Sequence, residues 1–209
     1  MLYSELQCSE AIRKAVERMG FAEMTEIQEK TIPVMLAGHD VIAKAPTGTG
    51  KTCAFGIPVA EHIQPENKYP QAVIMAPTRE LAQQIAEELS NLTYFMPEVQ
   101  VACVYGGANM EKQAKRLAEG CQIVVATPGR LMDHYKHHSI DISHVTQIVL
   151  DEADEMLNMG FYKDVRHIIE MMKARKALSM FSATISREVM DIGWLYQHNA
   201  EEITVQPKE

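Results

Sequence analysis

The 209-residue chain has 46% hydrophobic and 23% charged residues, the balance of an ordinary globular protein. Lys and Arg total 20 against 28 Asp and Glu, and the net charge of −8 argues against a nonspecific polyanion binder, whose domain is usually basic. Any contact with nucleic acid must therefore be local. No linker, repeat or charge block divides the sequence, so we predict one domain over residues 1–209.

The sequence shows few features of a membrane protein or of a metal-binding protein. No apolar run approaches the roughly 20 residues that cross a bilayer, and the N-terminus lacks the basic-then-apolar pattern of a secretory signal. We expect a cytoplasmic monomer with no membrane partner. No cysteine or carboxylate cluster completes a metal site around His134, His137 and His138, which we expect on a solvated helix surface. The cysteines, expected to be reduced and mostly buried, are Cys8, Cys53, Cys103 and Cys121.

Short apolar runs alternate with helical patterns along the chain. A helical segment with Ile12, Val16 and Met19 at helical spacing comes first, and Thr25 with Gln28 has capping-box spacing at the start of the next helix. Runs without polar alternation fit strands that are covered on both faces. We predict an α/β fold with an open, mainly parallel sheet of about seven strands flanked by helices. The predicted strands are 41–43, 72–76, 99–104, 123–126, 148–150, 178–181 and a last one at 203–207.

The segment Ala45-Pro46-Thr47-Gly48-Thr49-Gly50-Lys51-Thr52 follows the first predicted strand and opens a helix, which is the setting of a phosphate-binding loop. Its glycines let backbone N–H groups converge on phosphate oxygens, and the helix N-terminus adds positive potential. Lys51 is predicted to bridge the β and γ phosphates of a nucleotide, and Thr52 to hold Mg²⁺. Ala45 stands where the usual pattern has its first glycine. The alternative is a glycine-rich turn that closes a strand.

An acidic run, Asp151-Glu152-Ala153-Asp154, directly follows the predicted strand at 148–150. Ligands of open α/β sheets bind outside the carboxyl ends of the strands, so these side chains are expected at the nucleotide site. Asp151 is the candidate Mg²⁺ ligand, through water, and Glu152 is the candidate base or water-positioning residue. Taken alone, the run also fits a helix N-terminus enriched in acids.

In their order along the chain, the motifs resemble the first domain of the DEAD-box RNA helicases. Asp151 to Asp154 resembles the signature that names this family, and Ala45 to Thr52 matches its motif I. Gly20-Phe21 with Thr25-Glu26-Ile27-Gln28 looks like the adenine-reading Q motif, with Tyr3 as the upstream aromatic and Met24 in place of proline. The other matches are Pro77-Thr78-Arg79-Glu80-Leu81, Gly106-Gly107, Thr127-Pro128-Gly129-Arg130 and Ser182-Ala183-Thr184. This resemblance covers essentially the whole chain and implies a RecA-like P-loop NTPase domain.

The resemblance also implies roles for single residues. Gln28 should read adenine and Phe21 should pack on the base, although Gln28 alone would fit a helix-surface amide. Ser182 and Thr184 should bind Asp154 and tie the ATP site to RNA strand separation, or alternatively they and Ser186 cap a helix. The elements implied to bind the sugar and phosphate of RNA, each of which alone could be an ordinary turn or cap, are Pro77, Thr78, Arg79, Gly106, Gly107, Thr127 and Arg130.

Three functions stay open at this point. The first is an ATP-dependent RNA helicase, represented by its N-terminal domain, with ATP, Mg²⁺ and RNA as ligands. The second is a nucleotide- and RNA-binding module without turnover of its own, and the third is a translocase acting on DNA. Ala153 and the Gln28 motif favour the RNA family over the third. Nothing in the chain resembles the family's second RecA-like domain, which we expect as a partner in the same polypeptide, supplying the arginines that complete the ATP site.

Overall fold

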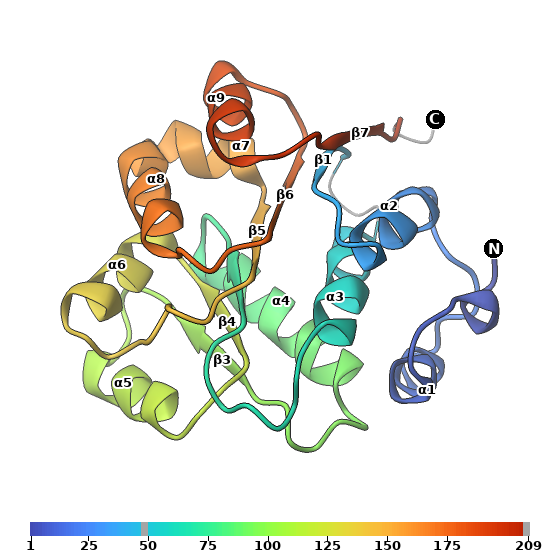
Figure 1. The fold of residues 1–209 in the computed structure, drawn as a ribbon, viewed down its shortest axis with the longest axis horizontal. Helices are drawn as coiled ribbons and strands as arrows, with labels where there is room; N and C mark the ends of the chain where they lie inside the picture. The colour runs from blue at the N-terminus through green and yellow to red at the C-terminus, as the bar shows by residue number, and fades with distance from the viewer. Residues whose placement is uncertain (47–49, 207–209) are drawn as a thin grey trace.

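The computed structural model describes residues 1–46 and 50–206, and its centre is one seven-stranded sheet (Figure 1). Neighbouring strands follow the order β3-β4-β2-β5-β6-β1-β7, and every neighbouring pair is parallel. The predicted open α/β sheet is thus confirmed. Its strands are β1 Val41–Lys44, β2 Ala72–Met75, β3 Val101–Val104, β4 Ile123–Ala126, β5 Gln147–Asp151, β6 Ala177–Ser182 and β7 Glu201–Thr204.

Helices cover both faces of the sheet. In Figure 1 the first four helices lie on one side of it, and α5, α6, α8 and α9 lie on the other. A single 3₁₀ turn, η1 Tyr3–Glu5, precedes them, and a short helix followed by the π-helical segment η2 Leu157–Phe161 joins β5 to α8. The α-helices are α1 Glu10–Arg18, α2 Glu26–Leu36, α3 Lys51–Glu61, α4 Arg79–Leu92, α5 Met110–Ala118, α6 Pro128–Lys136, α7 Ala153–Met156, α8 Tyr162–Met171 and α9 Arg187–Tyr196.

Two apolar cores, one on each face, hold the layers together. Successive side chains of a strand point to opposite faces. In β2, Ala72 and Ile74 therefore join the core that includes α2, α3 and α4, whereas Val73 and Met75 join the core with α6, α8 and α9. All four side chains are fully buried. Burial on both faces explains why the strands read as continuous apolar runs.

The two outermost strands differ from the prediction in their limits. β7 is Glu201–Thr204 rather than 203–207, of which residue 207 lies outside the described residues. Glu201 and Glu202 are exposed because β7 is an edge strand, and charged side chains at an edge hide the strand from an apolarity pattern. β3 begins at Val101 rather than at residue 99, since the Val99 N–H donates to the Met96 carbonyl at 3.0 Å in a turn.

The cysteines are free thiols, buried or half-buried as predicted. Burial raises the pKa of Cys103 and of Cys121 to about 11, so neither is a reactive thiolate at neutral pH. Among the described residues there is no cluster of three or more His, Cys, Asp and Glu side chains placed to hold a metal, and no helix long and apolar enough to cross a membrane.

The histidine prediction is wrong for one of the three residues. His137 and His138 are exposed, but His134 has no exposed surface. His134 lies one helical turn after the buried Leu131, on the face of α6 that packs against the sheet. Its Nδ1 is 3.0 Å from the Ser139 hydroxyl and its Nε2 is 3.1 Å from Gln113 Oε1. Both ring nitrogens thus have partners in the interior.

Candidate functional site

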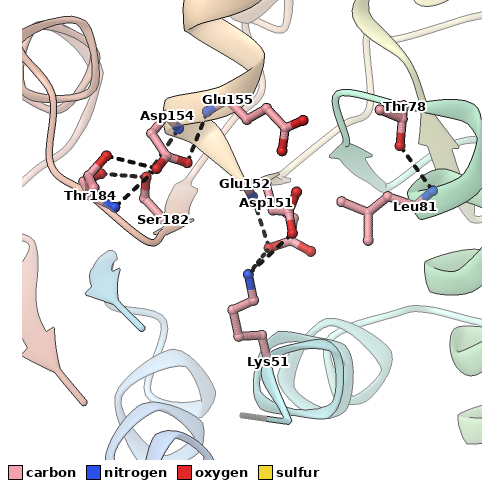
Figure 2. Close-up of polar contacts among 9 residues, drawn as sticks. All are labelled: Lys51, Thr78, Leu81, Asp151, Glu152, Asp154, Glu155, Ser182 and Thr184. Carbon is pink, nitrogen blue, oxygen red and sulfur yellow. Dashed lines mark hydrogen bonds and ion pairs between the residues drawn. The ribbon is translucent and has the colours of Figure 1, made fainter. Parts of the chain in front are cut away.

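The phosphate loop and the acidic run meet at one edge of the sheet because their strands are close neighbours there. β6 lies between β5 and β1, and the three strands end at the same edge. The Ala45 N–H, directly after β1, donates to the carbonyl of Ser182 at 2.9 Å. Figure 2 shows Lys51 from the start of α3 pointing at Asp151 and Glu152 from the end of β5.

Gly50 is the part of the phosphate loop where the need for glycine is visible. It is the N-cap of α3 and has a φ of 84°, a left-handed conformation that favours glycine. A Cβ added there would lie 2.6 Å from Gln28 Nε2 and 3.0 Å from Thr25 Oγ1. Ala45, in contrast, is 1% exposed and packs in the core, so an alanine suits that position. Thr47, Gly48 and Thr49 lie outside the described residues.

Lys51 is held inside the site by carboxylates. Its side chain is 8% exposed, and Nζ lies 3.5 Å from Asp151 Oδ1 and 3.9 Å from Glu152 Oε1. Asp151 is 2% exposed at its side chain, and burial raises its pKa, while the neighbouring Lys51 favours the charged form. Lys51 therefore offsets two partly desolvated carboxylates. Thr52 is half-buried in the first turn of α3, beside Lys51.

Glu152 combines an unusual backbone with an unusual carboxyl group. Its φ is 48°, a left-handed conformation that costs a non-glycine residue about 1–3 kcal/mol and must be held by the surrounding structure. The Glu152 N–H donates to Asp151 Oδ1 at 3.0 Å, which helps to hold this turn. Burial, together with the hydrogen bond to Glu155, raises the pKa of Glu152 to about 7. Such a carboxylate accepts a proton readily at neutral pH.

Asp154, in the short helix α7 after β5, belongs to a second polar cluster with residues at the end of β6 (Figure 2). Its Oδ2 accepts hydrogen bonds from the Thr184 N–H at 3.0 Å and from the Thr184 hydroxyl at 2.8 Å. The Asp154 N–H in turn donates to Ser182 Oγ at 3.1 Å. Burial raises the pKa of Asp154, but the hydrogen bonds outweigh it and hold that pKa below its ordinary value. The cap of α9 is Ser186, whose hydroxyl accepts from the Val189 N–H, and not Ser182 or Thr184.

A cleft of about 480 Å³ opens over these residues, within the range of small-molecule sites. Four carboxylates line it, from Glu152, Asp154, Glu155 and Glu188, and Lys51 is the one basic residue among its described lining. Mg²⁺ is usually bound by one or two carboxylates together with substrate phosphates and water, rather than by a full protein cage. The donor set therefore fits Mg²⁺ carried in with a phosphate ligand.

Gln28 lies beneath the phosphate loop rather than on a helix surface. It is 3% exposed, so the surface alternative is wrong. Its Oε1 accepts from the Thr25 N–H at 3.0 Å, within a capping box, and from the Tyr3 hydroxyl. Its Nε2 donates to the Gly50 carbonyl at 3.1 Å. The Gln28 carboxamide thus ties the start of α2 to the start of α3, and a base would compete with these partners.

The N-terminal segment is fastened around the Q motif by aromatic and backbone contacts. Phe21 is 42% exposed, and its ring stacks against Tyr3 with 6.3 Å between the centroids. Met24, in place of the family's proline, is 6% exposed and donates its N–H to the Met1 carbonyl at 2.9 Å. Proline has no N–H to donate, so this departure adds a hydrogen bond rather than loosening the turn.

The expected RNA-binding elements lie at the other half of the same sheet edge. They follow β2, β3 and β4, which are neighbours in the sheet. Thr78 caps α4 by accepting from the Leu81 N–H at 3.2 Å, and Arg79 is exposed with its guanidinium 4.6 Å above the Tyr105 ring. Gly107 has a φ of 83°. Pro77 is buried and Gly106 is exposed.

Thr127 and Arg130 complete this group at the start of α6. Thr127 is the N-cap of α6, and its N–H donates to the Val104 carbonyl at 3.1 Å. The Arg130 Nη1 donates to the Ala108 carbonyl and to Gln113 Oε1, each at 3.1 Å. Sequence reasoning did not single out Gln113 or Tyr105. The available signal was Gln113 itself, a polar residue four positions before the buried Leu117 on the apolar face of α5.

Comparisons with known proteins agree with this arrangement. A family model described as DEAD/DEAH box helicase matches residues 25–192. The chain belongs to the DEAD/DEAH box helicase family. The DEAD-box domain is 47% identical to the ATP-dependent RNA helicase CshA of Limosilactobacillus reuteri, with 100% of this chain and 42% of that protein covered. CshA of Listeria monocytogenes is also 47% identical, over 99% of this chain and 40% of that protein.

Solved structures support the same assignment. A crystal structure of a DEAD box protein from Methanococcus jannaschii matches with a TM-score of 0.91 and 39% identity, covering 99% of this chain and 56% of that one. A hypothetical ATP-dependent RNA helicase from Sulfolobus tokodaii matches with a TM-score of 0.87 and 40% identity, covering 94% and 57%. The predicted family and RecA-like fold are confirmed. The chain spans about two fifths of the length of these CshA relatives.

Proposed function

We propose that this DEAD-box domain binds ATP with Mg²⁺ together with the sugar-phosphate backbone of RNA. Joined to a second RecA-like domain, it would couple ATP hydrolysis to local separation of RNA strands. The observation that carries the proposal is the buried group of Lys51, Asp151 and Glu152 beside a 480 Å³ cleft. The names of the relatives, which are ATP-dependent RNA helicases, support the same conclusion.

The residues at the phosphate end have separable tasks in this proposal. Lys51, now 3.5 Å from Asp151, would turn its ammonium to the β and γ phosphates of the nucleotide. Asp151, through water, and Thr52 would hold Mg²⁺, which neutralises charge on the phosphate oxygens. Glu152 would orient the attacking water and accept its proton, for which a pKa of about 7 is suited. Gln28 and Phe21 would receive adenine.

Coupling between the two ligands is assigned to the Asp154 cluster. Asp154 is two residues from Glu152, and its carboxylate is held by both the N–H and the hydroxyl of Thr184. Ser182 donates its hydroxyl to the Thr184 carbonyl at 2.6 Å and accepts from the Asp154 N–H. A shift of the turn after β5 would therefore be passed directly to the turn after β6. This is where ATP binding would be communicated to a second domain.

Binding of both ligands tests the proposal. Isothermal titration of the wild-type chain with Mg²⁺-ADP and fluorescence anisotropy with a labelled oligouridine in low salt should each show saturable binding. Lys51→Ala should weaken nucleotide binding, and Arg79→Ala should weaken RNA binding, each without affecting the other ligand. Lys173→Ala, at an exposed lysine after α8, is the matched control. A wild-type chain that binds neither ligand would contradict the proposal.

Turnover separates a helicase domain from a binding module. The chain should be joined to the second RecA-like domain of a CshA relative, and phosphate release should be measured with and without RNA. RNA-stimulated release that Glu152→Gln abolishes supports the helicase function. Tight binding of both ligands without any release by the joined protein would leave only the binding module.

A further inference from the structure

A buried polar network joins two of the RNA-facing elements through one side chain, Gln113 of α5. Gln113 is 8% exposed. Its Nε2 donates to the Tyr105 carbonyl at 3.0 Å, directly before Gly106-Gly107. Its Oε1 accepts from Arg130 Nη1 and from His134 Nε2, each at 3.1 Å. One carboxamide thus contacts the loop after β3 and the first two turns of α6.

The partners fix the orientation of the network. A carbonyl can only accept, so the amide nitrogen of Gln113 must face Tyr105, and its oxygen must face the two donors. His134 must then carry a proton on Nε2. In the neutral ring, Nδ1 accepts from the Ser139 hydroxyl at 3.0 Å, for which the His134 carbonyl at 3.3 Å is the other acceptor. Burial and the adjacent Arg130 lower the pKa of His134, which agrees with a neutral ring.

The network reaches the exposed surface through Arg130 and Tyr105. Arg130 is 13% exposed at its side chain, and its Nη1 also donates to the Ala108 carbonyl at 3.1 Å. The Tyr105 ring lies under the guanidinium of Arg79, and its hydroxyl accepts from Gln83 Nε2 at 3.0 Å. The Nε of Arg130 also lies 3.5 Å from Asp133 Oδ2. A displacement of the Gln113 amide therefore removes one of three partners of Arg130 and moves the platform under Arg79.

Burying these polar groups is costly compared with an apolar filling of the same volume. Neighbouring positions on the same helices, Leu117 and Leu131, show that apolar side chains pack in this core. The polar set therefore calls for an explanation besides stability, and its outer ends are the residues assigned to RNA.

We propose that Gln113 and His134 are positioning residues for RNA binding, which hold Arg130 and the loop 105–108 in the arrangement that receives an RNA backbone. This inference rests on the proposed RNA-binding function. Gln113 supplies one acceptor for two donors and one donor for a carbonyl, a combination that neither glutamate nor methionine provides. His134 keeps the Gln113 oxygen directed toward Arg130.

The test compares Gln113→Met with Gln113→Glu in the 209-residue chain. Affinity for a labelled oligouridine should fall about tenfold in Gln113→Met, the scale of one lost hydrogen bond to a charged group. Affinity for Mg²⁺-ADP should stay within about twofold, because the phosphate site is built on other strands. Gln113→Glu keeps the acceptor for Arg130 and loses the donor to Tyr105, so its loss should be smaller.

Two further readouts separate positioning from mere structural support. The slope of log affinity against log salt should decrease by about 0.7 in Gln113→Met, because one phosphate contact to a single strand is lost. In an Arg130→Ala background, Gln113→Met should cause little further loss, since it acts mainly through Arg130. His134→Gln, which keeps an N–H donor, should bind RNA more tightly than His134→Phe.

The outcomes distinguish this inference from the function on which it rests. A wild-type chain that binds no RNA overturns both. If wild type binds RNA and folded Gln113→Met binds it equally well, the positioning role is overturned and the RNA-binding function stands. If Gln113→Met does not fold, Gln113→Glu and the two His134 variants decide by the same criterion. A loss of ADP and RNA affinity in equal proportion would point to general destabilisation and would also overturn the positioning role.

Discussion

The two halves of the sheet edge differ in how their charged side chains are buried and paired. At β5, β6 and β1, the charges of Lys51 and Asp151 are buried and bind each other. At β3, β4 and β2, Arg79 is exposed, and Arg130 donates to the carbonyl oxygens of Ala108 and Gln113, while its Nε lies 3.5 Å from the exposed carboxylate of Asp133. The first half keeps its charges inside the protein, whereas the second exposes Arg79 and holds Arg130 between two carbonyl oxygens and one exposed carboxylate.

This difference explains how a chain of net charge −8 could bind two polyanions. Under the proposed function, phosphates of a nucleotide would enter the cleft, where Lys51 would exchange one set of anions for another and the overall charge would matter little. A nucleic acid backbone would meet the other half, where Arg79 is exposed and the carboxylate beside Arg130 is itself exposed to solvent, which screens that pair. The net charge of the chain does not exclude the binding of polyanions, because it sums the charges of both halves.

The largest effect is expected on the rate of ATP hydrolysis, because the described residues of the phosphate half lack a group that turnover needs. Lys51 is the one basic residue in the described lining of its cleft, and a second cation on the γ phosphate contributes on the order of 10³–10⁵ to turnover in other phosphoryl-transfer enzymes. The 209-residue chain alone should therefore bind Mg²⁺-ATP but release phosphate slowly, with little stimulation by RNA. Joining a matching second domain should restore turnover.

Steady-state phosphate release by the isolated chain, with RNA titrated in, checks this expectation. Glu152→Gln in the joined protein is the control for contaminating ATPases. Robust RNA-stimulated release by the isolated chain would mean that the site already holds every group that turnover needs. The expectation that a second domain must supply a further cation would then be wrong.

Lys51→Met tests whether the buried charge of the phosphate half binds the nucleotide. A hydrogen bond to a charged group is worth about 1.5–3 kcal/mol, so affinity for ADP should fall roughly ten- to a hundredfold. The sheet should still fold, because Lys51 fills neither core, but its stability should fall because buried Asp151 loses its cation. Isothermal titration with circular dichroism measures both properties, and Lys173→Met is the matched control. Unchanged ADP affinity in a folded variant would remove the phosphate-loop assignment.

The sequence predicted one half of this edge better than the other. Continuous apolar runs located the strands because both faces are covered, and the motifs after the Q motif lie at or just beyond the ends of strands, as expected. The network of Gln113 and His134 was missed, since its partners are 21 residues apart and a helical period shows only that a position is buried. Nor could spacing reveal that Gln28 lies under Gly50, a contact between two helix starts.

Base selection tests whether the buried amide beneath the phosphate loop also faces the ligand. If Gln28 pairs with adenine, wild type should prefer ADP to GDP by about 1–3 kcal/mol, the scale of a bidentate pair, and Gln28→Ala should narrow the gap. Gln28→Ala also loses the bond to the Gly50 carbonyl, so both nucleotides should bind more weakly. Titrations of both proteins with ADP and GDP separate the two effects. Equal loss for ADP and GDP would assign Gln28 to loop support alone.

The smallest effect concerns stability in the half at β3, β4 and β2, where the His134 ring is buried. The pKa of His134 is lowered from 6.5 by burial first and by Arg130 second, against the raising effect of Asp133. Below pH 6.5 the unfolded chain therefore binds this proton more strongly than the folded one does. Stability should fall as the pH decreases from about 6.5, with a slope of at most about 1.4 kcal/mol per pH unit for one proton.

His134→Gln should flatten this dependence, because the variant has no group that titrates between pH 5 and 7 at this position. His39→Gln, at an exposed site outside this network, is the matched control. Urea unfolding between pH 5 and 7.5 measures the difference, above the range in which most carboxylates titrate. Equal slopes in wild type and His134→Gln would mean that folding does not lower the pKa of His134. The ring beside Gln113 would then take up a proton as readily in the folded protein as in the unfolded chain.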